Sequence, residues 1–260
     1  MTKIWSPPQL SLRFINIWRR NVLVWRKLAI PSMLGNLADP MLYMLGFGYG
    51  LGRMLPDVFG ISYIAFLAAG IVCSSTMTSA SFEAMYSGFS RMHVQKTWDA
   101  IMNTPVMLDD VLIGEAVWAA SKSLLSGSAV LLVASALGLC QSLLALWVLP
   151  IMFITGLAFA SLGLIVTAVS PSYDFFMYYF TLFITPMMLL CGVFFPAGEL
   201  PAILQQVALF LPLTHAVALV RPLMNDAVPP GMWVHVLALL AYAAAGFYVA
   251  LVLTRKRLLQ

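Results

Sequence analysis

The chain has 260 residues, of which 62% are hydrophobic and only 9% are charged, with a formal net charge of +4. Ordinary soluble domains carry about 25% charged residues, so this composition leaves no room for a sizeable soluble domain. The positive charge does not indicate nucleic-acid binding, because Lys and Arg cluster at the chain ends and beside apolar stretches. Several of those stretches approach the ~20 residues that a helix needs to cross a bilayer. The sequence therefore predicts an all-α integral membrane protein.

The first segment, residues 1–28, has the pattern of a helix that lies in the membrane interface. Apolar residues recur at helical spacing, and polar residues fall on another face. The apolar set is Leu10, Phe14, Trp18, Val22 and Trp25, and the polar set is Arg13, Asn16, Arg20 and Lys27. This abundance of Trp and Arg predicts an N-terminal amphipathic interface helix on the cytoplasmic side. We expect residues 29–260 to form one transmembrane domain.

Six membrane-spanning helices are expected in that domain. Their approximate ranges are 29–52, 61–85, 110–138, 143–169, 174–195 and 231–253. Between the last two, Pro201 and Pro212 are each placed to begin a short helix, since proline suits the first helical turn. Each piece, within residues 199–222, is about 15 Å long and too short to cross the membrane. We expect two short re-entrant helices on the outer side.

The basic residues indicate an orientation for these six spans. With the N-terminus inside, eleven of the fourteen Lys and Arg residues fall on the inner side. They are Lys3, Arg13, Arg19, Arg20, Arg26, Lys27, Arg91, Lys96, Arg255, Lys256 and Arg257. Because cytoplasmic loops are enriched in Lys and Arg, both termini are predicted to be cytoplasmic.

This orientation places a polar connecting segment, residues 86–109, in the cytoplasm. One helical stripe in it holds Val94, Trp98, Ile101, Met102 and Pro105, and another holds Lys96, Asp99 and Asn103. Thr104 precedes a proline, which disfavours helix at that residue, so a short helix over 94–104 should end near Asn103. Two interpretations are open. The helix either joins two spans along the interface, or its apolar stripe docks a cytoplasmic partner.

Three quoted stretches carry a resemblance to a known family. The chain contains LADPMLYMLGFGYGLG at 37–52, WDAIMNTPVMLDDVLIGE at 98–115 and LLCGVFFPAGELPAILQQVALFLPLTHAVALVR at 189–221. Over nearly its whole length it resembles the ABC-2 type family of transporter permeases, and within it the permeases of nodulation-factor exporters. The resemblance implies that the short cytoplasmic helix is a coupling helix, which fits a groove on a separate ATPase subunit. Its residues here would be Val94, Trp98, Asp99, Ile101, Met102, Asn103, Thr104 and Pro105.

The same resemblance implies the partners and the cargo. It implies a homodimer of permeases in the bacterial inner membrane, with two ATPase subunits that bind ATP and Mg²⁺. The chain itself has no G-x-x-x-x-G-K-[ST] phosphate-binding loop, so it is expected to be no enzyme and to hold no cofactor. The implied cargo is an amphipathic glycolipid such as a lipo-chitin oligosaccharide. Export of another amphipath, such as a polysaccharide lipid, an antibiotic or a drug, is the alternative, and a channel or scaffold without ATP coupling is a third.

Charged residues inside the predicted spans are costly and therefore informative. Asp39 and Lys122 are expected at comparable depth in spans 1 and 3, where they would form a charge pair; Glu83 is the alternative partner for Lys122. A pair that joins spans and a role in the transport path are both open interpretations.

The aromatic residues of span 5, the histidines and the cysteines are further candidates for a role. Aromatic residues of span 5 are weak candidates for the substrate path, namely Phe175, Tyr178, Tyr179 and Phe183. The histidines show no metal-binding motif. The three cysteines, Cys73, Cys140 and Cys191, are expected to be buried apolar residues, with a Cys140–Cys191 disulfide as the alternative.

Overall fold

The computed structural model describes residues 4–9, 11–52, 54, 57–58, 60–140 and 142–259. Its α-helices are α1 Phe14–Arg26, α2 Ala29–Gly50, α3 Tyr63–Phe82, α4 Thr97–Met102, α5 Leu108–Ala136, α6 Val148–Val169, α7 Phe175–Tyr179, α8 Thr185–Leu190, α9 Ala202–Leu209, α10 Pro212–Met224 and α11 Met232–Leu258. Short π- or 3₁₀-segments are η1 Glu83–Ser87, η2 Ser90–Val94, η3 Leu143–Trp147, η4 Phe180–Ile184 and η5 Ala197–Glu199. Two residues used in the sequence analysis, Lys3 and Leu10, lie outside the described residues. In the described part, the protein is helical apart from one isolated bridge, so the predicted all-α class is confirmed.

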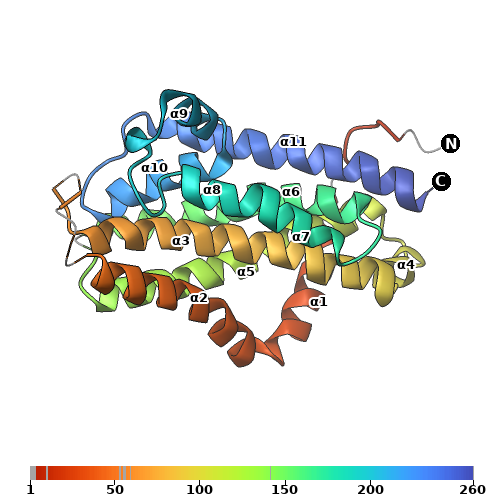
Figure 1. The fold of residues 1–260 in the computed structure, drawn as a ribbon. Coiled ribbons are helices and arrows are strands. Elements are labelled where there is room, and N and C mark those ends of the chain that lie inside the picture. The colour runs from red at the N-terminus through yellow and green to blue at the C-terminus, as the bar shows by residue number, and fades with distance from the viewer. Residues whose placement is uncertain are drawn as a thin grey trace.

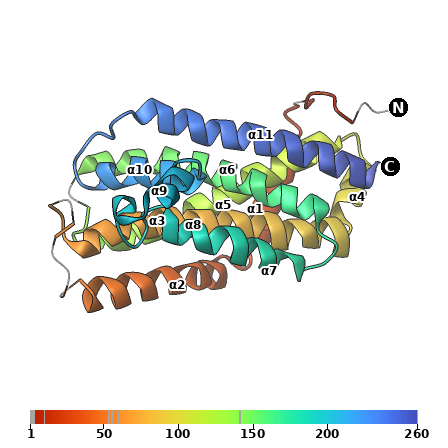
Figure 2. The same cartoon turned by 45° about the horizontal axis from the view of Figure 1, so that its top comes forward.

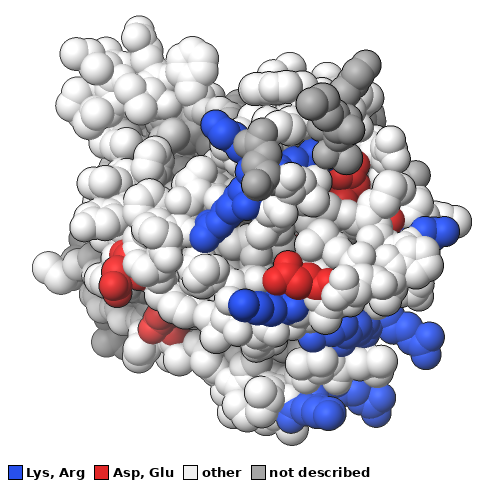
Figure 3. All heavy atoms as spheres, turned by 90° about the vertical axis from the view of Figure 1, so that its right-hand side faces the viewer, with Lys and Arg blue, Asp and Glu red and all other residues white. Residues whose placement is uncertain are grey.

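The long helices lie side by side in one bundle (Figures 1 and 2). Helix α3 runs through the middle of this bundle, α2 lies on its outside, and α1 turns sharply away from α2. The short helix α4 and both chain ends lie at one end of the bundle, and α9 lies toward the other. Lys and Arg side chains gather at the end that carries α4 (Figure 3).

Four of the described helices are long and apolar enough to cross a membrane. They cover Tyr63–Val94, Leu108–Ala136, Leu143–Val169 and Met232–Leu258, and α9 with α10 would make a fifth if that bent pair counts as one span. Helix α2 has 22 residues but contains Asn36, Asp39 and Pro40, and the apolar helix Phe175–Leu190 is shorter than the predicted span 174–195. The prediction of several membrane spans is confirmed, with four or five supported by length and composition.

Small residues bring the central helices close together. A Cβ added at Gly163 of α6 would lie 2.9 Å from the Ala84 Cβ, and one at Gly127 of α5 would lie 2.4 Å from the Thr76 hydroxyl. Between helices in a membrane no hydrophobic force favours contact over lipid, so close packing of small residues provides the attraction. These glycines allow α3, α5 and α6 to pack closely against one another.

Helix α3 continues beyond its predicted end at residue 85. The segments η1 and η2 extend it into one helix of 32 residues, Tyr63–Val94, which is about 48 Å long and exceeds the ~30 Å hydrocarbon core. Both extensions are π-helical, and such turns occur frequently at functional sites. Val94 therefore ends the α3 extension, and the prediction that it begins the connecting helix is wrong.

The two short helices after α8 begin beside Pro201 and Pro212, as the sequence predicts. Pro201 immediately precedes α9, Pro212 is the first residue of α10, and the two helices bend by 87°. Arg221 of α10 lies with its guanidinium 3.7 Å from the centre of the Phe66 ring and donates to the Gly192 carbonyl. This contact fastens α10 to α3 and to the turn after α8, where Gly192 has the positive φ that glycine tolerates.

Candidate functional site

The connecting segment forms a shorter helix than the sequence predicts. Lys96 adopts a left-handed conformation with φ of 50°, which breaks the chain direction between the α3 extension and α4. Helix α4 then covers only Thr97–Met102, and Asn103 caps its end as the following Thr-Pro pair predicted. The result is a six-residue helix at one end of the bundle, held between α3 and α5 (Figure 1).

The predicted coupling residues divide into an exposed and a buried set. Those exposed to solvent are Val94, Asp99, Asn103, Thr104 and Pro105. Ile101 and Met102 are half-buried against the core, and the Trp98 side chain is 1% exposed. The prediction that Trp98 contributes to an exposed docking face is therefore wrong, because its indole is buried in the protein.

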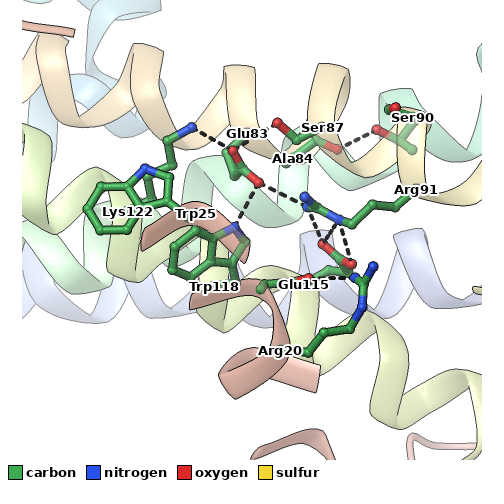
Figure 4. A network of polar contacts seen from close by, with 12 residues as sticks. Arg20, Trp25, Glu83, Ala84, Ser87, Ser90, Arg91, Glu115, Trp118 and Lys122 are labelled. Carbon is green, nitrogen blue, oxygen red and sulfur yellow. Dashed lines mark hydrogen bonds and ion pairs between the residues drawn. The ribbon is translucent and has the colours of Figure 1, made fainter. Parts of the chain in front are cut away.

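Trp98 instead joins α4 to a buried charge network. Figure 4 shows its members Glu83, Arg91, Glu115, Trp118 and Lys122. The Trp98 indole Nε1 donates to Glu115 of α5 at 3.1 Å. The Arg91 guanidinium, on the α3 extension, contacts both Glu115 oxygens at 2.5–3.1 Å and Glu83 at 3.0 Å. A continuous chain of contacts therefore runs from α4 through α5 to the two π-segments of α3.

Glu83 is the centre of the deeper half of this network. It is 3% exposed and accepts hydrogen bonds from Lys122 at 2.7 Å, from the Trp118 indole at 2.7 Å and from Ser87 at 2.9 Å. The predicted Asp39–Lys122 pair is wrong, since Lys122 binds the alternative partner that the sequence offered. In the described part of the chain Asp39 has no ion pair.

The network contains two cations and two carboxylates and is largely buried. Arg91 and Lys122 are 13% and 14% exposed, and both carboxylates are at most 3% exposed. Removing one member of such a set leaves an uncompensated buried charge, which costs about 3–5 kcal/mol. The charge network therefore fixes α5 against the α3 extension, and the Trp98 hydrogen bond to Glu115 joins α4 to this unit.

A second set of contacts ties both chain ends to the start of α5. Asp109 accepts from the Arg255 guanidinium of α11 at 2.5 Å and 3.1 Å and from the Gln9 backbone at 2.8 Å. The Ser11 hydroxyl donates to Asp110 at 2.7 Å. These carboxylates lie in the first turn of α5, where negative charge favours the start of a helix, and they also bind the N-terminal segment and α11 beside α4.

The aromatic residues proposed for the substrate path do not line a cavity described here. Phe175, Tyr178 and Phe183 are exposed, and Tyr179 is buried. Two cavities instead follow the groove between α2, α3 and α8. A polar one of about 350 Å³ is lined by Asn36, Asp39, Ser75, Ser79, Phe180 and Thr185 among others. An aromatic one of about 880 Å³ continues from it and is lined by Tyr43, Phe47, Tyr63, Met188, Phe194 and Pro196 among others.

The cysteines and histidines have simple contacts. All three cysteines are free, so the alternative Cys140–Cys191 disulfide is absent. His215 and His235, which looked unrelated in sequence, lie with their Nδ1 atoms 2.9 Å apart. Within the described residues, no group of three or more metal-ligating side chains occurs.

Comparison with known proteins places this arrangement in a family. The sequence profile described as ABC-2 type transporter matches residues 12–225, which include α2 to α10 and the whole charge network. The chain belongs to the ABC-2 type transporter family. Members are permease components, and the chain is accordingly a transporter permease with several membrane-spanning helices.

Individual relatives cover almost the whole permease. It is 48% identical over 253 residues to nodulation protein J of Rhizobium leguminosarum bv. trifolii, covering 97% of both chains. It is 46% identical over 252 residues to nodulation protein J of Rhizobium meliloti, covering 97% of this chain and 96% of that protein. The similarity to inner membrane transport permease YadH of Escherichia coli is 22% over 205 residues, covering 78% and 79%.

Sequence reasoning missed Arg91, Glu115 and Trp118 as members of the network. One signal was present, because Glu115, Trp118 and Lys122 are spaced three and four residues apart and share one face of α5. The two π-segments that turn Glu83 and Arg91 toward that face had no comparable signal.

Proposed function

We propose that this permease is the membrane-spanning subunit of an ATP-driven exporter, and that a separate ATPase subunit docks on the exposed side of α4. The observation that carries the proposal is the contact chain from Trp98 to Glu83. It connects α4 to α5 and to the α3 extension through hydrogen bonds and ion pairs. The docking residues are Val94, Asp99, Asn103, Thr104 and Pro105, all exposed at one end of the bundle. ATP and Mg²⁺ belong to the partner subunit.

The charge distribution supports an orientation for these spans. Lys and Arg side chains gather at the end with α4 (Figure 3), where α11 ends with Arg255, Lys256 and Arg257. We place this end in the cytoplasm, because cytoplasmic segments of inner-membrane proteins are enriched in Lys and Arg. Helices α2 and Phe175–Leu190 then complete six spans, with α9 and α10 as re-entrant helices on the outer side.

The cargo we propose is an amphipathic glycolipid, with lipo-chitin oligosaccharides as the class that the nodulation relatives suggest. The polar and aromatic cavities between α2, α3 and α8 support this choice, since one offers hydroxyl groups and a carboxylate and the next offers rings. Both cavities share Tyr43, Thr185 and Met188, so they form one track. Two permeases facing each other with α2 and α8 would enclose this track between them.

The docking proposal is tested by charge reversal on α4. Asp99→Lys should reduce copurification of the ATPase and its transport-coupled hydrolysis, because Asp99 is exposed on the proposed contact surface. The matched control is Glu199→Lys, which reverses an exposed acid on η5, and it should leave copurification intact. Equal copurification for both variants would remove α4 as the docking site, and transport without any ATPase would favour a channel.

A further inference from the structure

A cavity lies between α1 and the charge network. We name it the α1 cavity; its volume is about 490 Å³. Arg20, Asn21 and Trp25 of α1 form one wall, and the other includes Glu83, Arg91 and Lys122 of the network. Figure 4 shows Arg20, Arg91 and Lys122 coming from different helices around this region.

Positive charge is in excess around the α1 cavity. Arg91 and Lys122 are compensated by Glu83 and Glu115, whereas Arg20 has no carboxylate within ion-pair distance in the described structure. Burial, and then the neighbouring Arg91 charge, lower the pKa of Arg20, and the Glu115 charge offsets this only in part. An anion bound in the cavity would stabilise the charged form of Arg20, because it would add a counter-charge close to the guanidinium.

A hydrogen-bond donor in the cavity wall also has no acceptor. The Asn21 side chain is 3% exposed, and its Oδ1 accepts from Arg20 at 3.0 Å. Its Nδ2 has no partner among the described atoms. A buried donor left unpaired is destabilising, so the site lacks an oxygen acceptor where Asn21 meets the cavity.

The rim of the cavity is apolar and open. Val24 and Leu28 line it and are 55% and 65% exposed, and both belong to or directly follow the amphipathic α1. A ligand that fits all these features has an anionic, oxygen-rich end for the wall and an apolar part beside the rim. We propose that the α1 cavity binds the phosphate-bearing headgroup of an anionic membrane lipid, with the acyl chains lying outside along Val24 and Leu28.

The test measures which lipid the full-length permease retains. The protein is purified in mixed micelles with equal amounts of phosphatidylglycerol and phosphatidylcholine, and bound lipid is counted by native mass spectrometry. Wild type should prefer phosphatidylglycerol. Arg20→Gln should reduce this preference about tenfold, the change expected for one lost charge-assisted hydrogen bond. Asn21→Ala should reduce it several-fold, and it provides a second reading if Arg20→Gln fails to fold.

The matched control is Arg19→Gln, because Arg19 is the neighbouring cation on α1, is exposed and does not line the cavity. It removes the same charge and should keep the wild-type preference. An equal loss in Arg19→Gln and Arg20→Gln would show general attraction to anionic lipid and overturn the site. Displacement of phosphatidylglycerol by millimolar inorganic phosphate would overturn the lipid assignment in favour of a free anion. The measurement needs no ATPase, so its failure is distinguishable from failure of the exporter proposal.

Discussion

Removing Glu83 and Lys122 together should destabilise the permease less than the sum of the two single substitutions. Lys122 donates to Glu83 at 2.7 Å, and the two side chains are 14% and 3% exposed. In the described structure Lys122 has no other carboxylate, whereas Glu83 also binds Arg91, Trp118 and Ser87. The two single substitutions are therefore unequal, and their effects should not add.

The contacts allow the loss of unfolding free energy to be worked out for each substitution. Glu83→Gln leaves Lys122 as a buried unpaired cation and should cost about 3 kcal/mol, the lower end for a broken buried pair. Lys122→Met removes one of the donors to Glu83 and should cost about 1–2 kcal/mol. The double variant should cost about 3 kcal/mol, because its second step no longer breaks a contact. This leaves a coupling energy of about 1–2 kcal/mol.

The assay is a double-mutant cycle on the free energy of unfolding, measured by denaturant titration in mixed micelles. The control cycle pairs Asp39→Asn with Lys122→Met, and its effects should add within about 0.5 kcal/mol because the two residues do not meet. Additive losses in the Glu83 cycle would refute the network as described. Coupling in the Asp39 cycle would instead restore the pair that the sequence favoured.

Three further predictions concern α4, α1 and the orientation. Trp98→Phe keeps the ring bulk but loses the hydrogen bond to Glu115, so the free energy of unfolding should fall by about 1.5–3 kcal/mol, with a larger loss of ATP-coupled transport than in Asn103→Ala. Gly114→Ala should weaken the packing of α1 on α5, because the new Cβ would lie 2.7 Å from the Ile17 Cβ. Amide exchange over Phe14–Arg26 should then be faster. Gly35→Ala, whose new Cβ meets no atom within 4 Å, should leave that exchange unchanged. In a cysteine-free background, a cysteine at Asp226 should react with an impermeant maleimide in intact cells and one at Asn103 should not; the reverse pattern would invert the proposed topology.

The sequence predicted features that depend on local chemistry and missed those that depend on three-dimensional direction. Pro201 and Pro212 begin helices, and Thr104 before a proline ends α4 near Asn103, because each effect acts within a turn or two. The inward direction of Trp98 was missed, since a stripe of apolar residues does not say which side of a short helix faces the protein.

Partner choice for Lys122 shows the same limit. Depth along a helix made Asp39 and Glu83 both plausible, and only rotation about the helix axis distinguishes them. The π-helical segment η1 begins at Glu83 and changes that rotation, so an ordinary 3.6-residue repeat does not describe the face that Glu83 occupies. The all-helical class and the membrane location follow from composition, which does not depend on such rotations.

The length of the Tyr63–Val94 helix has a mechanical consequence. It is one uninterrupted rod of 32 residues, about 48 Å long, with Arg221 fastened at one end and Arg91 at the other. A tilt of about 10° around Phe66, where Arg221 binds, would move Arg91 sideways by roughly 6.5 Å, more than the ~5.4 Å rise of one helical turn. Under the proposed docking, such a lever would convert a sideways displacement of several ångström beside α4 into a small change of angle beside α10.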